Sequence, residues 1–263
     1  MQRILILWAT LATLSFAHGS HAQDVPPGQV IQVESRGVKV PIYAVWKADA
    51  VASVVLDSGG AGGYGRIAED GWPASGNFLI RSGKLWASHP FNVIMVGRPA
   101  DIPDLDGVVR TGEQHAQDNL AIFRAIKQKS EAPIWVVGTS MGTISATAAA
   151  IQDKDHLLAG AVLTSSITSY RVPGAVRRQD LARIQIPVLV VHHEKDACKF
   201  CTPHEAKEIA GDLKNSPMKK TVLVNGGSGP TGDPCEARHW HGYIGMEKEA
   251  VDLIAAWIRN PTQ

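Results

Sequence analysis

Apolar residues in this chain gather in short runs separated by amphipathic or glycine-rich segments. Two early runs, residues 30–33 and 38–46, flank Ser35-Arg36-Gly37, and this spacing predicts an antiparallel hairpin. Several later runs are apolar at successive positions, which is typical of parallel strands that helices cover on both faces. We place these strands at residues 52–56, 91–96, 134–137, 159–163, 188–192 and 221–224.

The segments between these strands favour helices. Residues 113–129 repeat apolar side chains at helical spacing. Three further helices are expected at residues 144–151, 205–213 and 246–258. Strands that alternate with helices predict one α/β domain with a mainly parallel central sheet, helices on both faces and the hairpin at the N-terminal edge.

The first residues follow a different pattern. Met1-Gln2-Arg3 is a short basic end, residues 4–17 are almost wholly apolar, and Ser20-His21-Ala22 places small residues where a signal peptidase cleaves. The apolar run is shorter than the ~18 residues that span a bilayer, which argues against a membrane anchor. We therefore predict a signal peptide over residues 1–22, export to the periplasm or the medium, and a mature domain over residues 23–263 that does not contact the membrane.

Composition narrows the partners. The chain of 263 residues has 26 Lys and Arg against 25 Asp and Glu, a formal net charge of +1. This balance provides no basic field for nucleic acid, and no internal repeat suggests a solenoid or propeller. The roughly 240 residues after the signal peptide are enough for one domain with a sizeable core. We expect a small-molecule substrate, and the sequence leaves the oligomeric state open.

The most informative segment is Gly138-Thr139-Ser140-Met141-Gly142, directly after the apolar run 134–137. A buried strand, a tight turn and a helix in this order form the context of a G-x-S-x-G nucleophile elbow. Glycine at both ends lets the backbone turn sharply and pack closely, so that Ser140 presents its hydroxyl beyond the sheet. We therefore predict that Ser140 is a nucleophile and that the next helix directs N–H groups at the reacting oxygen.

A serine hydroxyl becomes an effective nucleophile when a base removes its proton and an acid orients that base. Functional groups in an open α/β sheet gather beyond the carboxyl ends of the strands, so the partners should follow later strands. Asp196 follows the strand at 188–192 and is the predicted acid, with Glu194 as the alternative. His241 comes after the last strand and directly before a glycine, and it is the predicted base, with His239 as the alternative.

These motifs resemble those of serine hydrolases of the α/β-hydrolase superfamily, over nearly all of the mature sequence. Gly-Thr-Ser-Met-Gly resembles the superfamily's elbow, Val-Val-His-His-Glu-Lys-Asp its strand-then-acid segment, and His-Gly-Tyr its histidine segment. The resemblance implies that Ser140, Asp196 and His241 are nucleophile, acid and base, in the chain order found on this fold.

The resemblance also bears on access to the site. Lipases and many peptidases of this superfamily carry a substantial cap between two of the later strands, whereas residues 164–187 are too few for a large cap domain. We therefore expect a fairly open site, with four aromatic side chains as candidates to line it: Trp72, Trp86, Trp240 and Tyr243.

An oxyanion hole needs two N–H groups aimed at the developing negative charge, and losing one costs on the order of 3 kcal/mol. Met141, which follows Ser140, is the predicted source of one. The second should come from the glycine-rich loop after the third strand, where we choose Gly60 over Gly59. Superfamily members often have His-Gly-Gly here, in place of Ser58-Gly59-Gly60. The loop lacks the patterns of nucleotide-binding loops, so we expect no cofactor.

The chain has three cysteines, an odd number for an exported protein. Cys198 lies two residues after Asp196 and Cys235 six residues before His241, so the cysteines approach one another if acid and base meet. This predicts a Cys198–Cys235 disulfide with Cys201 free. The pairs Cys201–Cys235 and Cys198–Cys201 are the alternatives.

A zinc site is another use for these side chains, because two of the cysteines have ligand-like spacing. Its candidate ligands are Cys198, Cys201, Cys235, His204 and His239. Oxidising compartments favour disulfides, so we expect no bound metal. The adjacent pair His192-His193 cannot easily bind one ion, because neighbouring strand residues point to opposite faces.

The sequence thus predicts an exported serine hydrolase that cleaves a carboxylic ester or related acyl bond of a small molecule through an acyl-enzyme. A peptidase, a lactone hydrolase or a thioester hydrolase are alternatives on the same fold. A catalytically silent binding protein that kept the fold is the alternative from a different class.

Overall fold

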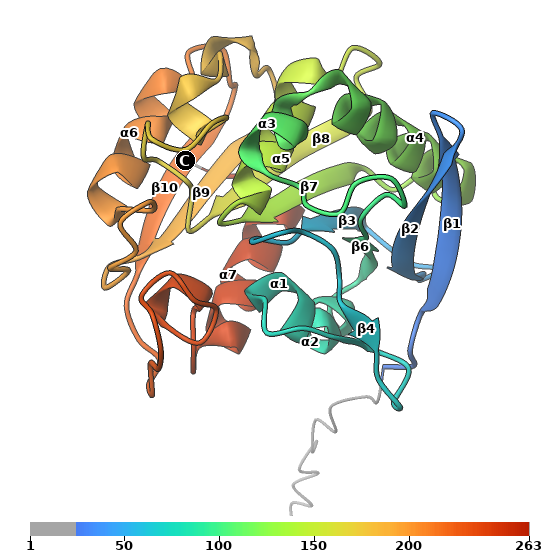
Figure 1. Cartoon of the computed structure of the whole chain (residues 1–263), viewed down its shortest axis with the longest axis horizontal. Coiled ribbons are helices and arrows are strands. Elements are labelled where there is room, and N and C mark those ends of the chain that lie inside the picture. Colours follow the sequence, from blue (N-terminus) through green and yellow to red (C-terminus); the bar gives the residue numbers. More distant parts are fainter. Residues whose placement is uncertain (1–24, 263) are drawn as a thin grey trace, which may run out of the picture.

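The computed structural model describes residues 25–262, and its centre is an eight-stranded sheet in the order β1-β2-β6-β3-β7-β8-β9-β10 (Figure 1). Strands β1 and β2 pair antiparallel, as do β2 and β6. All other neighbours in this sheet pair parallel. The predicted α/β class and N-terminal hairpin are confirmed. The signal-peptide prediction for residues 1–22 lies outside the described residues.

The strands agree with the apolar runs to within two residues at most ends. Their bounds in the large sheet are Gln29–Ser35 (β1), Val38–Val45 (β2), Ala52–Asp57 (β3), Phe91–Val96 (β6), Ile134–Thr139 (β7), Leu158–Thr164 (β8), Val188–His193 (β9) and Lys219–Val224 (β10). A separate two-stranded sheet, which the sequence analysis did not predict, pairs Arg66–Ile67 (β4) with Pro73–Ala74 (β5).

The hairpin between β1 and β2 turns at Arg36 and Gly37. Both have left-handed φ angles, 53° and 78°, which match the right-handed twist of the flanking strands in a two-residue turn. The Arg36 side chain also pairs with Asp118 at 2.8 Å, tying the turn to the adjacent helix. The hairpin is therefore stabilised at its turn as well as by the hydrogen bonds between its strands.

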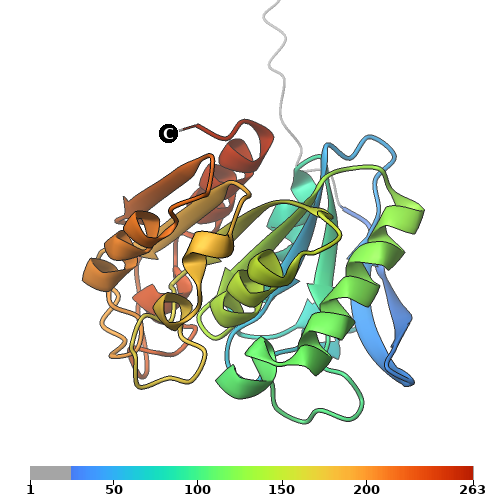
Figure 2. The same ribbon diagram turned by 90° about the horizontal axis from the view of Figure 1, so that it is seen from above.

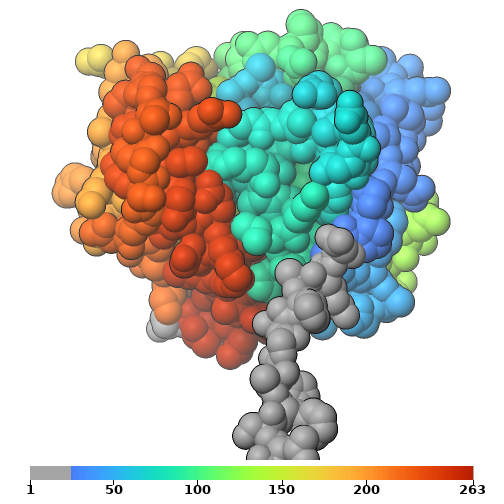
Figure 3. Space-filling view, turned by 90° about the horizontal axis from the view of Figure 1, so that it is seen from below, coloured from blue at the N-terminus to red at the C-terminus, as the bar shows by residue number. Residues whose placement is uncertain are grey.

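Helices cover both faces of the sheet, as expected for apolar strands. One face carries α3 (Gly107–Thr111), α4 (Glu113–Lys129), α5 (Gly142–Gln152) and α6 (Pro203–Asp212). Viewed from above, the green helix α4 runs beside the blue hairpin (Figure 2). The other face carries α1 (Phe78–Arg81), α2 (Gly83–Ser88) and α7 (Glu247–Arg259), and from below the teal and red segments lie side by side (Figure 3).

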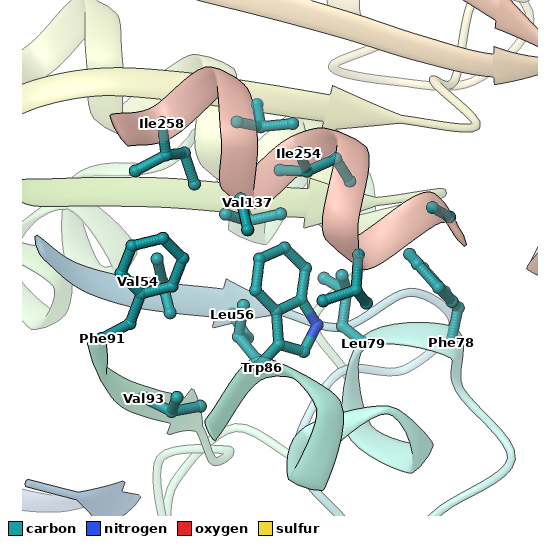
Figure 4. Close-up of a cluster of buried hydrophobic side chains, with 14 of the residues drawn as sticks. Val54, Leu56, Phe78, Leu79, Trp86, Phe91, Val93, Val137, Ile254 and Ile258 are labelled. Carbon is teal, nitrogen blue, oxygen red and sulfur yellow. The ribbon is translucent and has the colours of Figure 1, made fainter. Parts of the chain in front are cut away.

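The core beneath α1, α2 and α7 is built from large apolar side chains (Figure 4). Trp86 is fully buried beside Leu56 and Val137 of the sheet, and Ile254 of α7 belongs to the same cluster. Its indole N–H donates to the Ser82 hydroxyl at 3.1 Å, so burial leaves no orphaned donor. This layer of side chains stabilises the sheet whose strands lead to the candidate site.

Between β8 and β9, residues 165–187 contain only two short 3₁₀ turns, Val176–Arg178 (η1) and Leu181–Arg183 (η2). Within residues 25–262, no helix has the length and apolar character that crossing a membrane requires.

Candidate active site

The elbow lies where β7 ends and α5 begins. Ser140 has a φ of 53°, a left-handed conformation that serine seldom adopts, and its N–H donates to Thr164 O at 3.1 Å. A Cβ atom at Gly138 would lie 2.4 Å from Gly142 O, and one at Gly142 would lie 1.9 Å from Asp57 O. The glycines are therefore required by close backbone packing, which is the reason the sequence pattern suggested.

His241 and Asp196 come from separate loops and meet. His241 lies in a 3₁₀ turn, Trp240–Gly242 (η3), and its Nδ1 is 2.9 Å from Asp196 Oδ2. Both side chains are buried. Among the described residues, His241 Nε2 has no hydrogen-bond partner, and His241 lines the same pocket as Ser140. The imidazole thus has one nitrogen oriented by a carboxylate and the other available to accept a proton.

Asp196 is suited to remain ionised. Its Oδ1 accepts the Cys198 N–H at 2.9 Å, and its Oδ2 is 3.1 Å from His192 Nε2 as well as close to His241. Burial favours the neutral acid, but the hydrogen bonds from His192 and His241 outweigh it and lower the pKa of Asp196 to about 2. A permanently charged carboxylate can stabilise an imidazolium beside it.

The backbone around His241 is held from two sides. Its carbonyl accepts a hydrogen bond from the Ser165 hydroxyl at 2.7 Å. The next carbonyl, that of Gly242, accepts one from Arg81 Nη2 at 2.5 Å. Tyr243 follows with a φ of 57°, and its buried hydroxyl donates to Val191 O at 2.8 Å. These contacts anchor the turn to β8, β9 and α1.

The alternative acid and base lie elsewhere. Glu194 is exposed and accepts a hydrogen bond from Asn225 at 2.9 Å. His239 packs edge-on against Trp240, with ring centroids 6.3 Å apart, and does not line the pocket of Ser140. The structure therefore brings together the pair Asp196 and His241, which the sequence analysis preferred.

His192 is a neighbour of the site that the sequence analysis assigned only to packing. Its Nε2 lies 3.1 Å from Asp196 Oδ2 and 2.9 Å from the carbonyl of Cys201. His193 points the other way, with its Nε2 3.2 Å from Gly226 O and its ring stacked on Trp240. Alternation along β9 accounts for both positions. The contact between His192 and the Asp196 carboxylate is visible only in the folded structure.

Gly60 and Met141, the predicted oxyanion donors, both line the pocket with Ser140. Within the part of the chain that the structure describes, neither N–H has a hydrogen-bond partner. Gly59 packs against Ser140, because a Cβ there would lie 2.9 Å from Ser140 Cβ. Gly60 has a φ of 58° and open space where a Cβ would be. Glycine is therefore favoured here by the backbone conformation of the turn and not by close packing.

Arg110 anchors the loop that contains Gly59 and Gly60, and no pattern in the sequence indicated this contact. Its guanidinium is buried and donates to Ser58 O at 3.2 Å and Gly60 O at 3.1 Å. It also donates to Leu105 O at 2.6 Å and to the Ser145 hydroxyl at 2.8 Å. One side chain therefore joins helix α5 to the loop Ser58–Gly60, the predicted oxyanion loop.

The charge of Arg110 is only partly balanced. Burial lowers the pKa of Arg110 to about 10, opposed chiefly by the nearby Asp57 carboxylate. Burial raises the pKa of Asp57 to about 7, opposed by Arg110. His115, whose Nε2 is 2.9 Å from the Ser145 hydroxyl, has its pKa lowered to about 4 by burial and by Arg110, so it is neutral near pH 7. The region behind the oxyanion loop is thus a buried polar network.

The pocket at Ser140 has a volume of about 520 Å³. Apolar side chains dominate its wall: Phe78, Met141, Ile167, Val172 and Phe200. Glu236 is its one acidic residue, and no Lys or Arg is in the lining as the structure describes it. A larger hollow of about 690 Å³ between the hairpin and α4 contains no candidate nucleophile.

The four aromatic residues proposed to line the site do not do so. Trp72, Trp86 and Tyr243 are buried in the core beneath the sheet, and Trp240 packs against His193. The predicted lining was wrong because tryptophan and tyrosine bury large apolar surfaces and more often serve packing.

The structure contains the Cys198–Cys235 disulfide, and Cys201 is a free, buried thiol. The candidate zinc ligands do not assemble as the sequence analysis considered. In residues 25–262, the only Cys, His, Asp or Glu group close enough to hold an ion is Cys198, Cys201 and His241, with ligand atoms within 4.8 Å of one another. His204 and His239 are not part of it.

Comparison with known proteins yields structural neighbours only. No protein-family model and no curated protein matches the sequence. An esterase from Pyrococcus furiosus is similar with a TM-score of 0.65 and 13% identity, over 98% of this chain and 96% of that one. A dienelactone hydrolase from Anabaena variabilis has a TM-score of 0.63 and 13% identity, over 89% and 97%. An esterase from Exiguobacterium antarcticum has a TM-score of 0.60 and 11% identity, over 88% and 100%.

These likenesses extend over most of both chains in each case. Together with the eight-stranded sheet, they show that the chain has the α/β-hydrolase fold.

Proposed function

We propose that this protein is a serine hydrolase that cleaves a carboxylic ester, or a related acyl bond, in an uncharged small molecule. One observation carries the proposal: His241 is paired with Asp196 through Nδ1, and its unpartnered Nε2 belongs to the pocket that contains Ser140. The hydrolases and esterases among the structural neighbours support it.

The steps follow from these groups. Ser140 Oγ attacks the acyl carbon while His241 Nε2 takes its proton, and Asp196 stabilises the imidazolium that forms. The N–H groups of Gly60 and Met141 donate to the tetrahedral oxyanion. His241 then protonates the leaving alkoxide, which leaves an acyl group on Ser140. Water, deprotonated by His241, attacks this ester, and the acid is released.

An active-site-directed fluorophosphonate tests the chemistry directly. We expect it to label the mature protein, and Ser140→Ala to abolish labelling without changing the thermal unfolding temperature by more than a few degrees. Folded wild-type protein that takes up no label would favour the catalytically silent binding protein. A set of p-nitrophenyl esters of increasing acyl length would then define the acyl preference.

The charge of the pocket predicts a substrate class. Glu236 would repel a substrate carboxylate, and no basic side chain of the described lining offsets it. We expect p-nitrophenyl butyrate to be preferred over the mono-p-nitrophenyl ester of succinate. The ratio should be about fivefold, as roughly 1 kcal/mol of like-charge repulsion implies. Glu236→Gln should reduce this ratio, and a preference for the anionic ester would contradict the assignment.

Ester, lactone, thioester and peptide substrates share this chemistry, so turnover of matched acyl donors decides between them. An ester specialist should hydrolyse p-nitrophenyl butyrate faster than the p-nitroanilide and the thioester of the same acid. A preference for the anilide would indicate the peptidase alternative.

We further propose that residues 1–22 form a signal peptide and that the mature domain is exported. The Cys198–Cys235 disulfide supports export, because oxidising compartments favour such bonds. N-terminal sequencing of protein from the bacterial periplasm should begin at Gln23. An uncleaved chain retained in the cytoplasm would contradict this.

A further inference from the structure

We propose that the active site contains a redox-gated site for a thiophilic metal ion, formed by Cys198, Cys201 and His241 when the Cys198–Cys235 bond is open. Ligand atoms of these three side chains lie within 4.8 Å of one another, and all three residues are buried. In the oxidised protein, the bond to Cys235 occupies the Cys198 sulfur. Reduction frees this sulfur and completes the donor set.

The two cysteines lie at the ends of one turn. Cys201 N–H donates to Cys198 O at 3.0 Å, which folds residues 198–201 back and directs both sulfurs to one side. The Cys201 thiol also interacts with the Ser140 hydroxyl. Cys201 is a free, buried thiol, and the hydrolytic steps proposed above give it no role.

His241 is prepared to act as a ligand. Its Nδ1 is 2.9 Å from Asp196, and its Nε2 is buried without a partner among the described residues. Histidine ligands usually have one nitrogen on the metal, while the other donates its N–H to a carboxylate, a backbone carbonyl or water. The Asp196–His241 pair would provide that arrangement, with the Ser140 hydroxyl or a water near the fourth position.

The donor set selects the class of ion. Two thiolates and an imidazole suit Zn²⁺, Cd²⁺ or Cu⁺ and exclude the oxygen-preferring Mg²⁺ and Ca²⁺. Around tetrahedral zinc, Zn–S bonds of ~2.3 Å and Zn–N bonds of ~2.1 Å place ligand atoms about 3.5–3.8 Å apart. The present group must contract by about 1.0–1.3 Å at most, which a Cys198 side chain released from Cys235 can supply.

The chemistry balances with a phosphine as reductant. The phosphine cleaves the disulfide and becomes its oxide with an oxygen from water, whose two protons appear on the Cys198 and Cys235 thiols. Zn²⁺ then displaces one proton each from Cys198 and Cys201. Two thiolates and a neutral imidazole neutralise the ion.

Metal binding would remove the general base. A metal on His241 prevents it from taking a proton, so hydrolysis stops; this consequence rests on the proposed function, whereas the binding does not. The disulfide would then protect the active site, because it withholds one ligand from metal ions. A newly exported chain would be sensitive to zinc until the bond forms.

Cys235→Ala, prepared under reducing conditions, gives the decisive test, since it removes the disulfide partner of Cys198 without removing a proposed ligand. We expect the mature variant to bind one Zn²⁺ per chain in equilibrium dialysis, and Co²⁺ to produce thiolate-to-cobalt charge-transfer absorption. Zinc should lower hydrolysis more than tenfold relative to the metal-free variant, and EDTA should restore it. Oxidised wild type should show none of these effects, and phosphine-reduced wild type should show all of them.

The matched controls remove one ligand each from the Cys235→Ala background. Cys201→Ala or His241→Ala should weaken zinc binding by more than ~100-fold, because a tetrahedral site loses a primary ligand. If Cys235→Ala and reduced wild type remain folded by circular dichroism and bind no zinc, the proposal is wrong. It is also wrong if removing Cys201 leaves the affinity unchanged. Stoichiometric binding that is weakened by His241→Ala but does not inhibit hydrolysis would uphold the site and refute His241 as the base.

Discussion

The two sides of the Ser140 pocket are held by different means. On the side of the proposed oxyanion donors, called here the oxyanion side, the loop at Ser58–Gly60 is fixed by the buried guanidinium of Arg110, through hydrogen bonds to two of its carbonyls. On the side of the proposed acid and base, called here the acid–base side, the loops of Asp196 and His241 are joined by the Cys198–Cys235 disulfide and by their own hydrogen bond. The hydrogen bonds of Arg110 do not depend on redox conditions, whereas the disulfide is covalent and can be reduced.

The two sides are held differently because their loops follow different strands of the sheet. The oxyanion loop leaves β3, which pairs directly with the elbow strand β7, so a few hydrogen bonds suffice to place its N–H groups. Asp196 and His241 are 45 residues apart, with α6 and β10 between them. Closing a loop of 37 residues with a disulfide lowers the entropy of the unfolded chain by the equivalent of about 4 kcal/mol. Long connections therefore gain more from a covalent tie.

The largest effect is expected on the acid–base side. His241→Ala should reduce kcat by about 10³–10⁶-fold, because an unactivated serine hydroxyl is weakly nucleophilic. Steady-state hydrolysis of p-nitrophenyl butyrate measures it. Ser140→Ala should cost about as much, and the double variant little more, since the two residues act as a unit. Additive losses would contradict the triad.

Arg110→Met tests the oxyanion side. Without the guanidinium, the Ser58–Gly60 loop should no longer be held in position. We expect kcat to fall by roughly 10- to 100-fold with little change in KM, which approaches the effect of losing one oxyanion donor. The variant should also be less stable, because Asp57 loses its neighbouring charge.

The control for Arg110 separates positioning from stability. Asp57→Asn added to Arg110→Met removes the unpaired buried carboxyl and should recover much of the lost unfolding free energy. It should not restore kcat. If kcat and stability recover together, Arg110 has only a structural role.

Opening the disulfide should have a smaller effect on turnover than the loss of Arg110. Cys235→Ala should lower the free energy of unfolding by up to about 4 kcal/mol, measured by urea titration with EDTA present. Adding a phosphine should destabilise wild type to a similar extent and leave the variant unchanged. Equal stability of oxidised and reduced wild type would show that the bond does not constrain the fold.

The pH dependence of stability distinguishes the two carboxyls. The pKa of Asp57 is raised to about 7 in the folded protein, so between its unfolded pKa near 4 and pH 7 the native state holds more protons. This residue therefore lowers stability as pH rises from about 4 to 7, by at most about 1.4 kcal/mol per pH unit. Asp57→Asn should remove that slope in urea titrations at pH 5, 6 and 7. An unchanged slope would show that Arg110 keeps Asp57 ionised.

Asp196 acts in the opposite sense. Its folded pKa of about 2 lies below its unfolded value, so its contribution to stability is present above pH 4 and is lost as pH falls toward 2. The slopes from Asp57 and Asp196 therefore occupy different pH ranges and can be measured in one protein.

The smallest effect is expected for His239→Ala. His239 lies outside the pocket and contacts Trp240, so kcat/KM should remain within about twofold of wild type, as is usual for a substitution away from the reacting groups. This variant is the matched control for His241→Ala, two residues away. A loss of several powers of ten would transfer the role of base to His239.

Much of the fold was predictable because its signals are local. Apolar runs marked all eight strands of the main sheet, and the periodicity of residues 113–129 marked α4 with its observed bounds. The helices α1, α2 and α3 were missed because four to six residues are too few to establish a period. The Ser140 elbow was visible for the same local reason: its glycines and flanking elements are contiguous.

The tertiary structure decided what depends on residues distant in sequence. Glu194 and Asp196 follow the same strand, and His239 and His241 precede the same helix. The contact between the two loops shows that Asp196 and His241 are the pair that meets. Arg110 has no sequence signature, because a buried arginine is recognised by the carbonyls around it and these come from another loop. The sequence by itself determined the strands, most helices and the elbow, since backbone propensity and apolar spacing act over a few residues. Partners, pairings and buried charges were decided by packing, which brings together groups that no local pattern relates.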